Sequence, residues 1–351
     1  MVTIKIKHNI LPFAAVIASM LCIFKMPEAV TQGVTDGLKI SFNVILPSLF
    51  PFMVLSSYTV KAEALSFMYK IFYPITKFIL RQPICTVPVI IMGLAGGFPV
   101  GTKMTYLLLE KGQITKNQAG RLCMFCVNGG PAFVITAVGV NMLGSAKAGV
   151  IIFASLCISS LILGFATSFF DDKKHAEKCI ENSAQSPLAA LSASVTDGMQ
   201  SILGICSWVV LFSGLTECIK AVAISDTAYS GLVSVLEVTK GCTLIAGKMG
   251  LPVLAAAIGF GGFCVHCQIF SYIKAAELKY SHFFAGRVLC AALSAVICHL
   301  LLLFFPVDVT TAAINTDISS AAFSVSLPAF IALTIMCIVM IFDIDTKKKV
   351  W

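Results

Sequence analysis

The chain has 351 residues, of which 58% are hydrophobic and only 12% are charged, and its formal net charge is +8. Soluble domains are about 25% charged, so a water-soluble protein of this size could not cover its surface with so few charges. The composition excludes a soluble globular protein. It predicts an all-α polytopic integral membrane protein of the cell membrane, for which the lipid bilayer supplies most of the solvent.

Basic residues gather in short loops and near both ends of the chain, as Lys5, Lys173 and Lys347 do. This distribution is typical of cytoplasmic membrane loops. No basic stripe with interleaved aromatic residues is present, so we expect no nucleic-acid partner. Most of the 14 cysteines lie in apolar runs, where a thiol behaves as a small hydrophobic group. No zinc-type spacing occurs, and we expect neither a metal nor another cofactor.

The hydrophobic pattern predicts about eight or nine segments. The first lies within 1–32, where an uncharged run between Lys7 and Lys25 is typical of a retained signal anchor. The others are each close to the roughly 20 residues needed to span hydrocarbon. They are expected at 38–60, 84–100, 122–142, 146–170, 198–223, 243–265, 283–306 and 319–342.

Three stretches separate or flank these segments. An amphipathic piece at 64–81 is expected to lie along the membrane interface. The stretch 171–194 is a predicted polar linker, and 343–351 is a basic tail.

Proline and glycine interrupt three of the segments. Pro47 and Pro51 lie in the first, Gly93–Pro99 in the second, and Asn128-Gly129-Gly130-Pro131 in the third. Proline removes an amide donor and glycine loosens a helix, so the freed backbone groups need partners in protein or in a water-filled cavity. Kinked but continuous helices are one interpretation. Several breaks so close together favour broken or re-entrant helices that line a site.

Three triplets recur in order along the chain. Thr35-Asp36-Gly37 returns as Thr196-Asp197-Gly198, Gly96-Gly97-Phe98 as Gly261-Gly262-Phe263, and Ala119-Gly120-Arg121 as Ala285-Gly286-Arg287. Asp36 and Gly96 are 60 residues apart and Asp197 and Gly261 are 64 apart, while each Gly-to-Arg distance is 25 or 26 residues.

The pattern predicts an internal duplication of a four-segment unit, with a first membrane repeat at 33–170 and a second at 195–342. Transporters built this way bind their substrate near the interface between the repeats. Nine spans would place the two lysine-bearing ends on opposite sides, which the positive-inside rule opposes. Parallel and inverted arrangements therefore both remain open.

Arg121 and Arg287 are the matched cations of the two repeats. An arginine fork suits a carboxylate or a phosphate, although an interfacial arginine can also extend to lipid headgroups. Thr115, six residues before Arg121, is predicted to cap its helix in a capping box with Gln118. The glycine-rich turns would expose backbone amides to an anion, or would serve close helix packing.

Other polar residues lie inside the apolar segments. Cys264-Val265-His266-Cys267 has too few ligands for a zinc site, so His266 is interpreted as a polar group that lines a cavity. Lys248 would be costly within 243–265 and is a functional candidate there. Glu217 is expected to pair with Lys220. No GxxxxGK[ST], HExxH or GxSxG motif is present, so we expect no enzyme.

The stretch Gly97-Phe98-Pro99-Val100-Gly101 and the run from Arg121 to Pro131 resemble the YlbJ-type sporulation integral membrane proteins, of the nucleoside-recognition (Gate) domain group. The resemblance implies a Gate-like first repeat, a role in endospore formation and transport of a small anion such as dipicolinate. The second half matches less closely, because Gly262-Phe263 is followed by Cys264 and not by proline.

The leading function is a transporter or permease for a small organic anion. The alternatives are a nucleoside or other small-solute transporter of the Gate group, and a non-transporting membrane scaffold or spore maturation factor. A homo-oligomer or a membrane partner is compatible with each. The predicted substrate-binding residues are Arg121, Arg287, Lys103, Gly96, Gly97, Pro99, Gly101, Asn128, Gly129, Gly130, Pro131, Gly261, Gly262, His266 and Gln268.

Overall fold

The computed structural model describes Ile17, Met20 and residues 23–62, 69–170, 186–221 and 225–307. Within these ranges the chain is helical apart from turns, and no strand is present. The predicted all-α membrane fold is confirmed. The predicted segment 319–342, the basic tail 343–351, and parts of the anchor 1–32 and the linker 171–194 lie outside the described residues.

Short helices dominate the first part of the described chain and longer ones the second. The first part contains α2 (Pro27–Ile40), η2 (Ser41–Ile45), α3 (Leu46–Lys61), α4 (Tyr69–Pro74), η4 (Ile75–Ile79), η5 (Ile84–Thr86), α5 (Val87–Ala95), α6 (Phe98–Glu110), α7 (Lys116–Phe125), η6 (Ala132–Met142), α8 (Ala146–Thr167) and η7 (Ser168–Phe170). The second contains α9 (Pro187–Ala221), α10 (Asp226–Leu236), α11 (Val238–Ile245), α12 (Leu251–Phe260), α13 (Gly262–Ala275) and α14 (Tyr280–Phe304).

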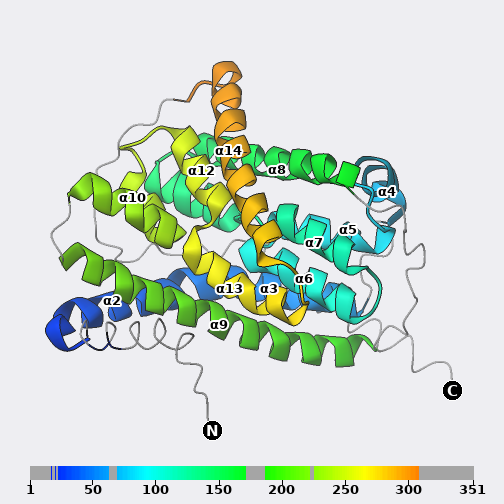
Figure 1. Ribbon diagram of the computed structural model, residues 1–351, viewed down its shortest axis with the longest axis horizontal. Helices are drawn as coiled ribbons and strands as arrows, with labels where there is room; N and C mark the ends of the chain where they lie inside the picture. The colour runs from blue at the N-terminus through cyan, green and yellow to red at the C-terminus, as the bar shows by residue number, and fades with distance from the viewer. Residues whose placement is uncertain are drawn as a thin grey trace, which may run out of the picture.

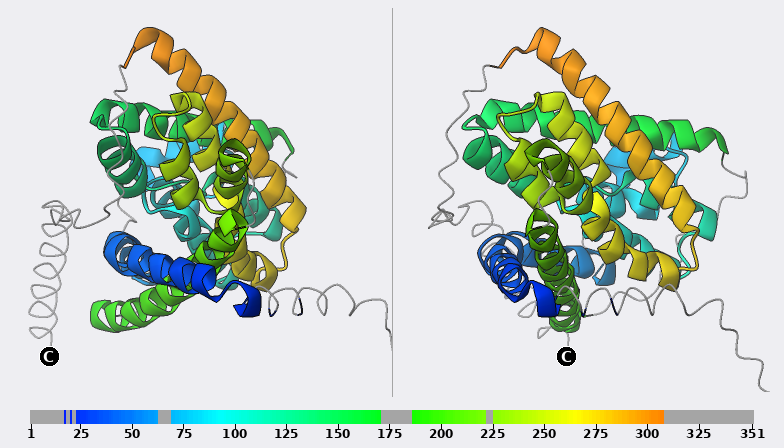
Figure 2. Two further views of the ribbon diagram at one scale, coloured as in Figure 1. Left: turned by 90° about the vertical axis from the view of Figure 1, so that its left-hand side faces the viewer. Right: turned by 60° about the vertical axis from the view of Figure 1, so that its left-hand side comes forward.

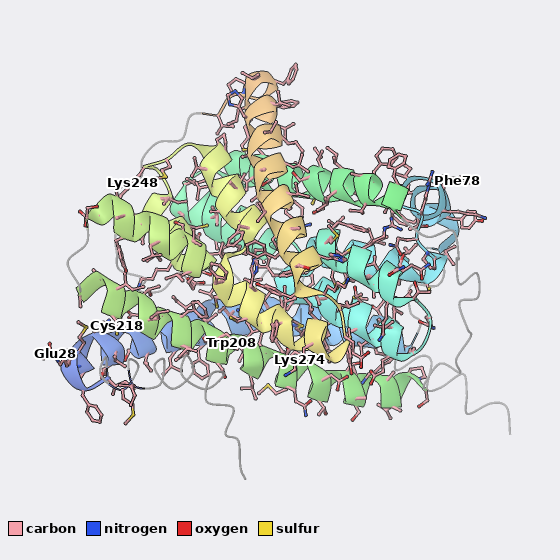
Figure 3. All side chains as sticks on the ribbon, in the orientation of Figure 1. Glu28, Phe78, Trp208, Cys218, Lys248 and Lys274 are labelled. Atoms are coloured by element: carbon pink, nitrogen blue, oxygen red, sulfur yellow. The ribbon has the colours of Figure 1, made fainter. Side chains whose placement is uncertain are left out.

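Four stretches of the described chain are long and apolar enough to cross a membrane, namely α8, α9, α12 with α13, and α14. Two bent pairs raise the number to six if each pair is one span. Large apolar side chains such as Phe165, Leu211 and Leu303 are exposed on these helices. Side chains project from the outer helix faces all round the molecule in Figure 3, as expected for a surface that meets lipid.

Helix α9 forms one side of the molecule and packs along α2 and α3 (Figure 1). On another side, α14 crosses α8 at a steep angle and runs alongside α12, which Figure 2 shows from two further directions. Helices α6 and α13 lie between these two sides and contact each other. The residues where helices end and begin at 96–98, 127–130 and 261–262 are mostly buried.

The helices are interrupted at two of the three predicted positions and at the second glycine-rich turn, whereas α3 continues through Pro47 and Pro51. Helix α5 ends at Ala95, and α6 begins after Gly97, whose φ is +97°. Helix α7 ends at Phe125, and η6 begins only after Pro131. Helix α12 gives way to α13 at Gly261, whose φ is +86°. A positive φ favours glycine, so the glycines allow these abrupt changes of direction.

The loop before α7 also has the predicted form. Thr115 accepts a hydrogen bond from the Gln118 amide, and the Gln118 side chain accepts one from the Thr115 amide. This reciprocal pair is the predicted capping box, and it fixes the start of the helix that carries Arg121.

Two expectations about charged residues were wrong. Lys248 lies exposed in the loop between α11 and α12 and not inside a span, because the segment 243–265 is divided there (Figure 3). Glu217 pairs with Lys240 of α11 and not with Lys220 of its own helix. The folded chain brings a lysine from another helix against the partly buried carboxylate.

Candidate functional site

The three helix breaks meet at one place in the interior. A methyl group added to Gly129 would lie 3.4 Å from the Phe98 ring, and one added to Gly261 would lie 3.3 Å from the same ring. One added to Gly130 would lie 3.0 Å from the carbonyl oxygen of Ala95. Residues 95–98, 127–130 and 259–262 therefore form one group, which we name the break cluster.

Arg287 joins two of the breaks. Its side chain is almost fully buried, and its guanidinium donates hydrogen bonds to the main-chain carbonyls of Val127 and Gly259. Carbonyls at the carboxyl end of a helix carry a partial negative charge that an arginine neutralises. Arg287 therefore stabilises the carboxyl ends of α7 and α12 from its position on α14.

Arg121 has the same kind of contact at a different place. It is buried and donates to the carbonyls of Leu80 and Arg81, just after η4. The two predicted solute-binding arginines are thus directed at separate helix ends and not at one another. A solute carboxylate would have to compete with main-chain carbonyls for either guanidinium.

Asn128 lies in the break cluster and is fully buried. Its Nδ2 donates to Ser160 Oγ of α8 over 2.7 Å, whereas its Oδ1 has no hydrogen-bond partner among the described residues. A buried polar atom without a partner is costly and needs an explanation. It marks a position where a solute or water can complete the hydrogen bonding.

Lys103 follows the first break by one and a half turns of α6 and is 4% exposed. Its amine donates to the main-chain oxygen of Asp197 at 3.1 Å and to Ser201 Oγ at 2.9 Å. The Asp197 carboxylate pairs with Lys61 of α3 and accepts a hydrogen bond from Ser57 at 3.1 Å. These five residues are the lysine cluster.

A second charged group lies at the other end of the apolar part of α9. Glu217 pairs there with Lys240. Nearby, the buried Glu237 accepts hydrogen bonds from the amides of Thr239 at 3.0 Å and Lys240 at 2.6 Å, which caps α11. We name Glu217, Glu237 and Lys240 the acidic cluster.

His266 and Gln268 make their contacts locally. His266 bonds with the Tyr280 hydroxyl at 2.8 Å and the Phe260 carbonyl at 3.2 Å, and it lies among aromatic rings. Gln268 donates to Cys264 Sγ at 3.3 Å. Both side chains therefore bond to neighbouring residues of α12, α13 and α14.

The predicted residues fall into two sets. The set that the structure brings together comprises Gly96, Gly97, Pro99, Gly101, Asn128, Gly129, Gly130, Pro131, Gly261, Gly262 and Arg287. The second set, Lys103, Arg121, His266 and Gln268, directs its side-chain hydrogen bonds to the partners described above.

Sequence reasoning missed the roles of Lys61 and Glu237. Lys61 directly follows the predicted segment 38–60 and belongs to no motif, and the repeat motif marked Asp197 without indicating its partner.

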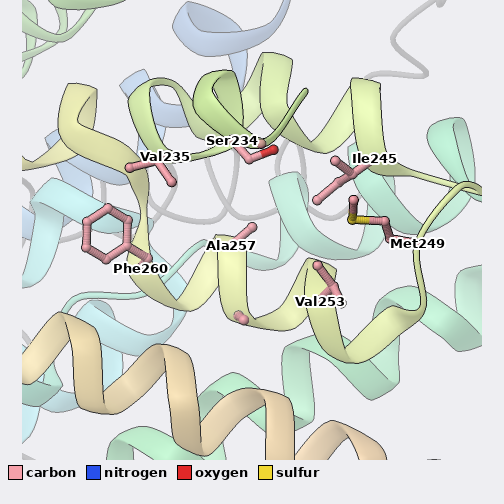
Figure 4. A pocket seen from close by; sticks show the side chains of 9 residues that line it. Ser234, Val235, Ile245, Met249, Val253, Ala257 and Phe260 are labelled. Carbon is pink, nitrogen blue, oxygen red and sulfur yellow. The ribbon is translucent and has the colours of Figure 1, made fainter. Parts of the chain in front are cut away.

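An apolar pocket of about 300 Å³ lies between α10, α11 and α12 (Figure 4). Val235, Met249, Val253 and Phe260 contribute to its wall, and Ser234 is its one hydroxyl-bearing residue. A charged solute gains nothing from such a lining, because burial without polar partners is unfavourable. The pocket therefore does not suit a charged solute.

Fold and site together define a multi-pass helical membrane protein with broken helices in its interior. Sporulation integral membrane protein YlbJ of Bacillus subtilis (strain 168) is 25% identical to this chain over 319 residues, which cover 78% of each protein. The chain is thus similar to a YlbJ-type sporulation integral membrane protein over most of its length, in line with the resemblance of its motifs. No family model and no solved structure matches it.

Proposed function

We propose that this protein is a permease for a small organic anion and acts in spore formation. The observation that carries the proposal is the meeting of three interrupted helices inside a membrane bundle. Irregular backbone at membrane depth is tolerated where it is buried in protein or lines a cavity, and broken helices are typical substrate sites of transporters. The sporulation role is carried over from the name of the Bacillus subtilis relative.

An anion is the solute class that the charges favour. Helices α6 and α13 both begin at the break cluster without a side-chain cap, so the amides at their amino-terminal ends bring a partial positive charge there. Lys103 adds a full positive charge on α6. We assign solute contacts to these amides, Asn128 and Lys103, and we assign Arg121 and Arg287 to holding the broken ends in place.

The internal duplication is part of the proposal. In each half a short helix, a glycine break and two further helices follow one another, with a buried arginine on the last. Tyr106 and Tyr272 are in register, and their ring centroids lie 6.3 Å apart. This contact supports an interface between repeats at 33–170 and 195–342, where a transported solute would bind.

The direct test is uptake of radiolabelled dipicolinate by proteoliposomes that contain the purified full chain. We expect saturable uptake that excess unlabelled dipicolinate suppresses and uridine does not. Suppression by uridine alone would favour a nucleoside transporter. Equal uptake by protein-free liposomes would contradict transport of this anion and favour a scaffold or maturation factor.

A further inference from the structure

We propose that Lys61 and Lys103 form a carboxylate-binding site in which the Asp197 side chain competes with the solute for the Lys61 ammonium group. The inference rests on the proposed function and assigns specific side chains to it. It also predicts opposite effects for neighbouring substitutions, which an ordinary structural ion pair does not.

The first support is geometric. Three elements that are far apart in sequence, α3, α6 and α9, each place one charged residue in the lysine cluster. Lys61 contacts the Asp197 carboxylate directly, and Ser57 donates to the same oxygen over 3.1 Å. The amine of Lys103 lies 3.1 Å from the main-chain oxygen of Asp197. A carboxylate that replaced the Asp197 side chain would therefore lie close to both ammonium groups.

The second support is the charge balance. The cluster holds two lysines and one aspartate, and the contacts of Lys103 within the described residues are to neutral oxygens. A buried ammonium group without a carboxylate contact has lost hydration without full compensation. An incoming carboxylate supplies that compensation, so the cluster favours an anionic ligand over a cationic or neutral one.

The third support is the gradient of exposure. The side chains of Asp197 and Lys61 are 33% and 15% exposed, whereas Lys103 is only 4% exposed. Lys103 is on the helix that begins at the break cluster, five residues or about 8 Å from Phe98. The charges thus lead from an accessible carboxylate to a buried ammonium group near the helix breaks.

A ring-bearing carboxylate has further partners beside the lysines. The Tyr272 hydroxyl donates to Ser201 Oγ at 3.2 Å, and Ser201 also accepts from Lys103. The neighbouring Tyr106 ring lies against Tyr272. Aromatic side chains beside paired cations suit a small planar molecule with carboxylates on its ring.

The test measures the Kd for radiolabelled dipicolinate with the full chain in lipid nanodiscs. We expect Lys103→Gln and Lys61→Gln to raise the Kd about tenfold or more, as loss of a charged hydrogen bond does. We expect Asp197→Asn to lower the Kd, because Lys61 is then released from its internal competitor. Lys147→Gln is the matched control, since Lys147 is exposed and its hydrogen bond within the described residues goes to the Pro306 carbonyl.

A structural ion pair predicts a different pattern, in which Asp197→Asn and Lys61→Gln weaken binding together and lower the unfolding temperature together. That result, or an unchanged Kd for Lys103→Gln, would overturn the inference. If a glutamine variant fails to fold, the direction of the Kd change in Lys103→Arg and Asp197→Asn still tests the inference. If the wild-type protein takes up dipicolinate and the lysine variants bind it with an unchanged Kd, this site alone is refuted. If the wild-type protein neither binds nor takes up dipicolinate, the proposed function is refuted as well.

Discussion

Replacement of Arg287 by alanine is expected to destabilise the folded protein by about 2–6 kcal/mol, the cost of leaving two buried carbonyls without a donor. The change leaves the carbonyls of Val127 and Gly259 without their donor at the centre of the bundle. Each unsatisfied buried carbonyl costs about 1–3 kcal/mol. The measurement is equilibrium unfolding of the detergent-solubilised protein, followed by the loss of helical circular dichroism.

Arg287→Lys is the matched comparison, and we expect it to recover only part of the lost stability, because one ammonium group lacks the planar fork that reaches two carbonyls. If Arg287→Ala kept the wild-type stability and lost only dipicolinate affinity, the arginine would act on the solute directly. The motif-based expectation would then replace the backbone role assigned here.

Replacement of Gly101 by alanine is expected to cost more than 4 kcal/mol and to leave little folded protein. A methyl group at this position would overlap the main-chain carbonyl oxygen of Cys126, and neither backbone can move without shifting α6 or the end of α7. Fluorescence-detected size-exclusion chromatography of a tagged variant measures the folded fraction. We expect the monodisperse peak to be lost.

Gly120 provides the control for this prediction, since it lies in helix α7 and a methyl group there would meet no atom within 4 Å. Gly120→Ala should retain the wild-type peak and raise stability by up to about 1 kcal/mol, because alanine favours helix more than glycine does. Similar behaviour of both alanine variants would contradict the close contact between α6 and the α7 end.

Features with a local cause could be predicted from the sequence. The spans follow from long apolar runs, and the breaks at Gly97 and Gly261 follow from glycines that tolerate a positive φ. The capping box at Thr115 follows from a spacing of three residues. In each case the residues that determine the feature are neighbours in the chain.

Partners that meet only through the tertiary fold could not be predicted. Lys61 and Asp197 are 136 residues apart, and Glu217 selects Lys240 over the nearer Lys220. The contacts of Arg287 are still less visible, because main-chain carbonyls exist at every position and leave no residue pattern. The arginines were therefore recognised as important while their binding partners were not.

Helix α9 has a charge-free stretch from 198 to 216, and ion pairs at Asp197 and Glu217 fasten its two ends to α3 and α11. The length between the two acidic residues is about 30 Å, which equals the hydrocarbon thickness of a typical bilayer. The charge-free stretch therefore matches the hydrocarbon layer in length, with one ion pair at each of its ends. A bilayer of clearly different thickness would bring one of these charged positions into hydrocarbon or leave apolar residues of α9 in water.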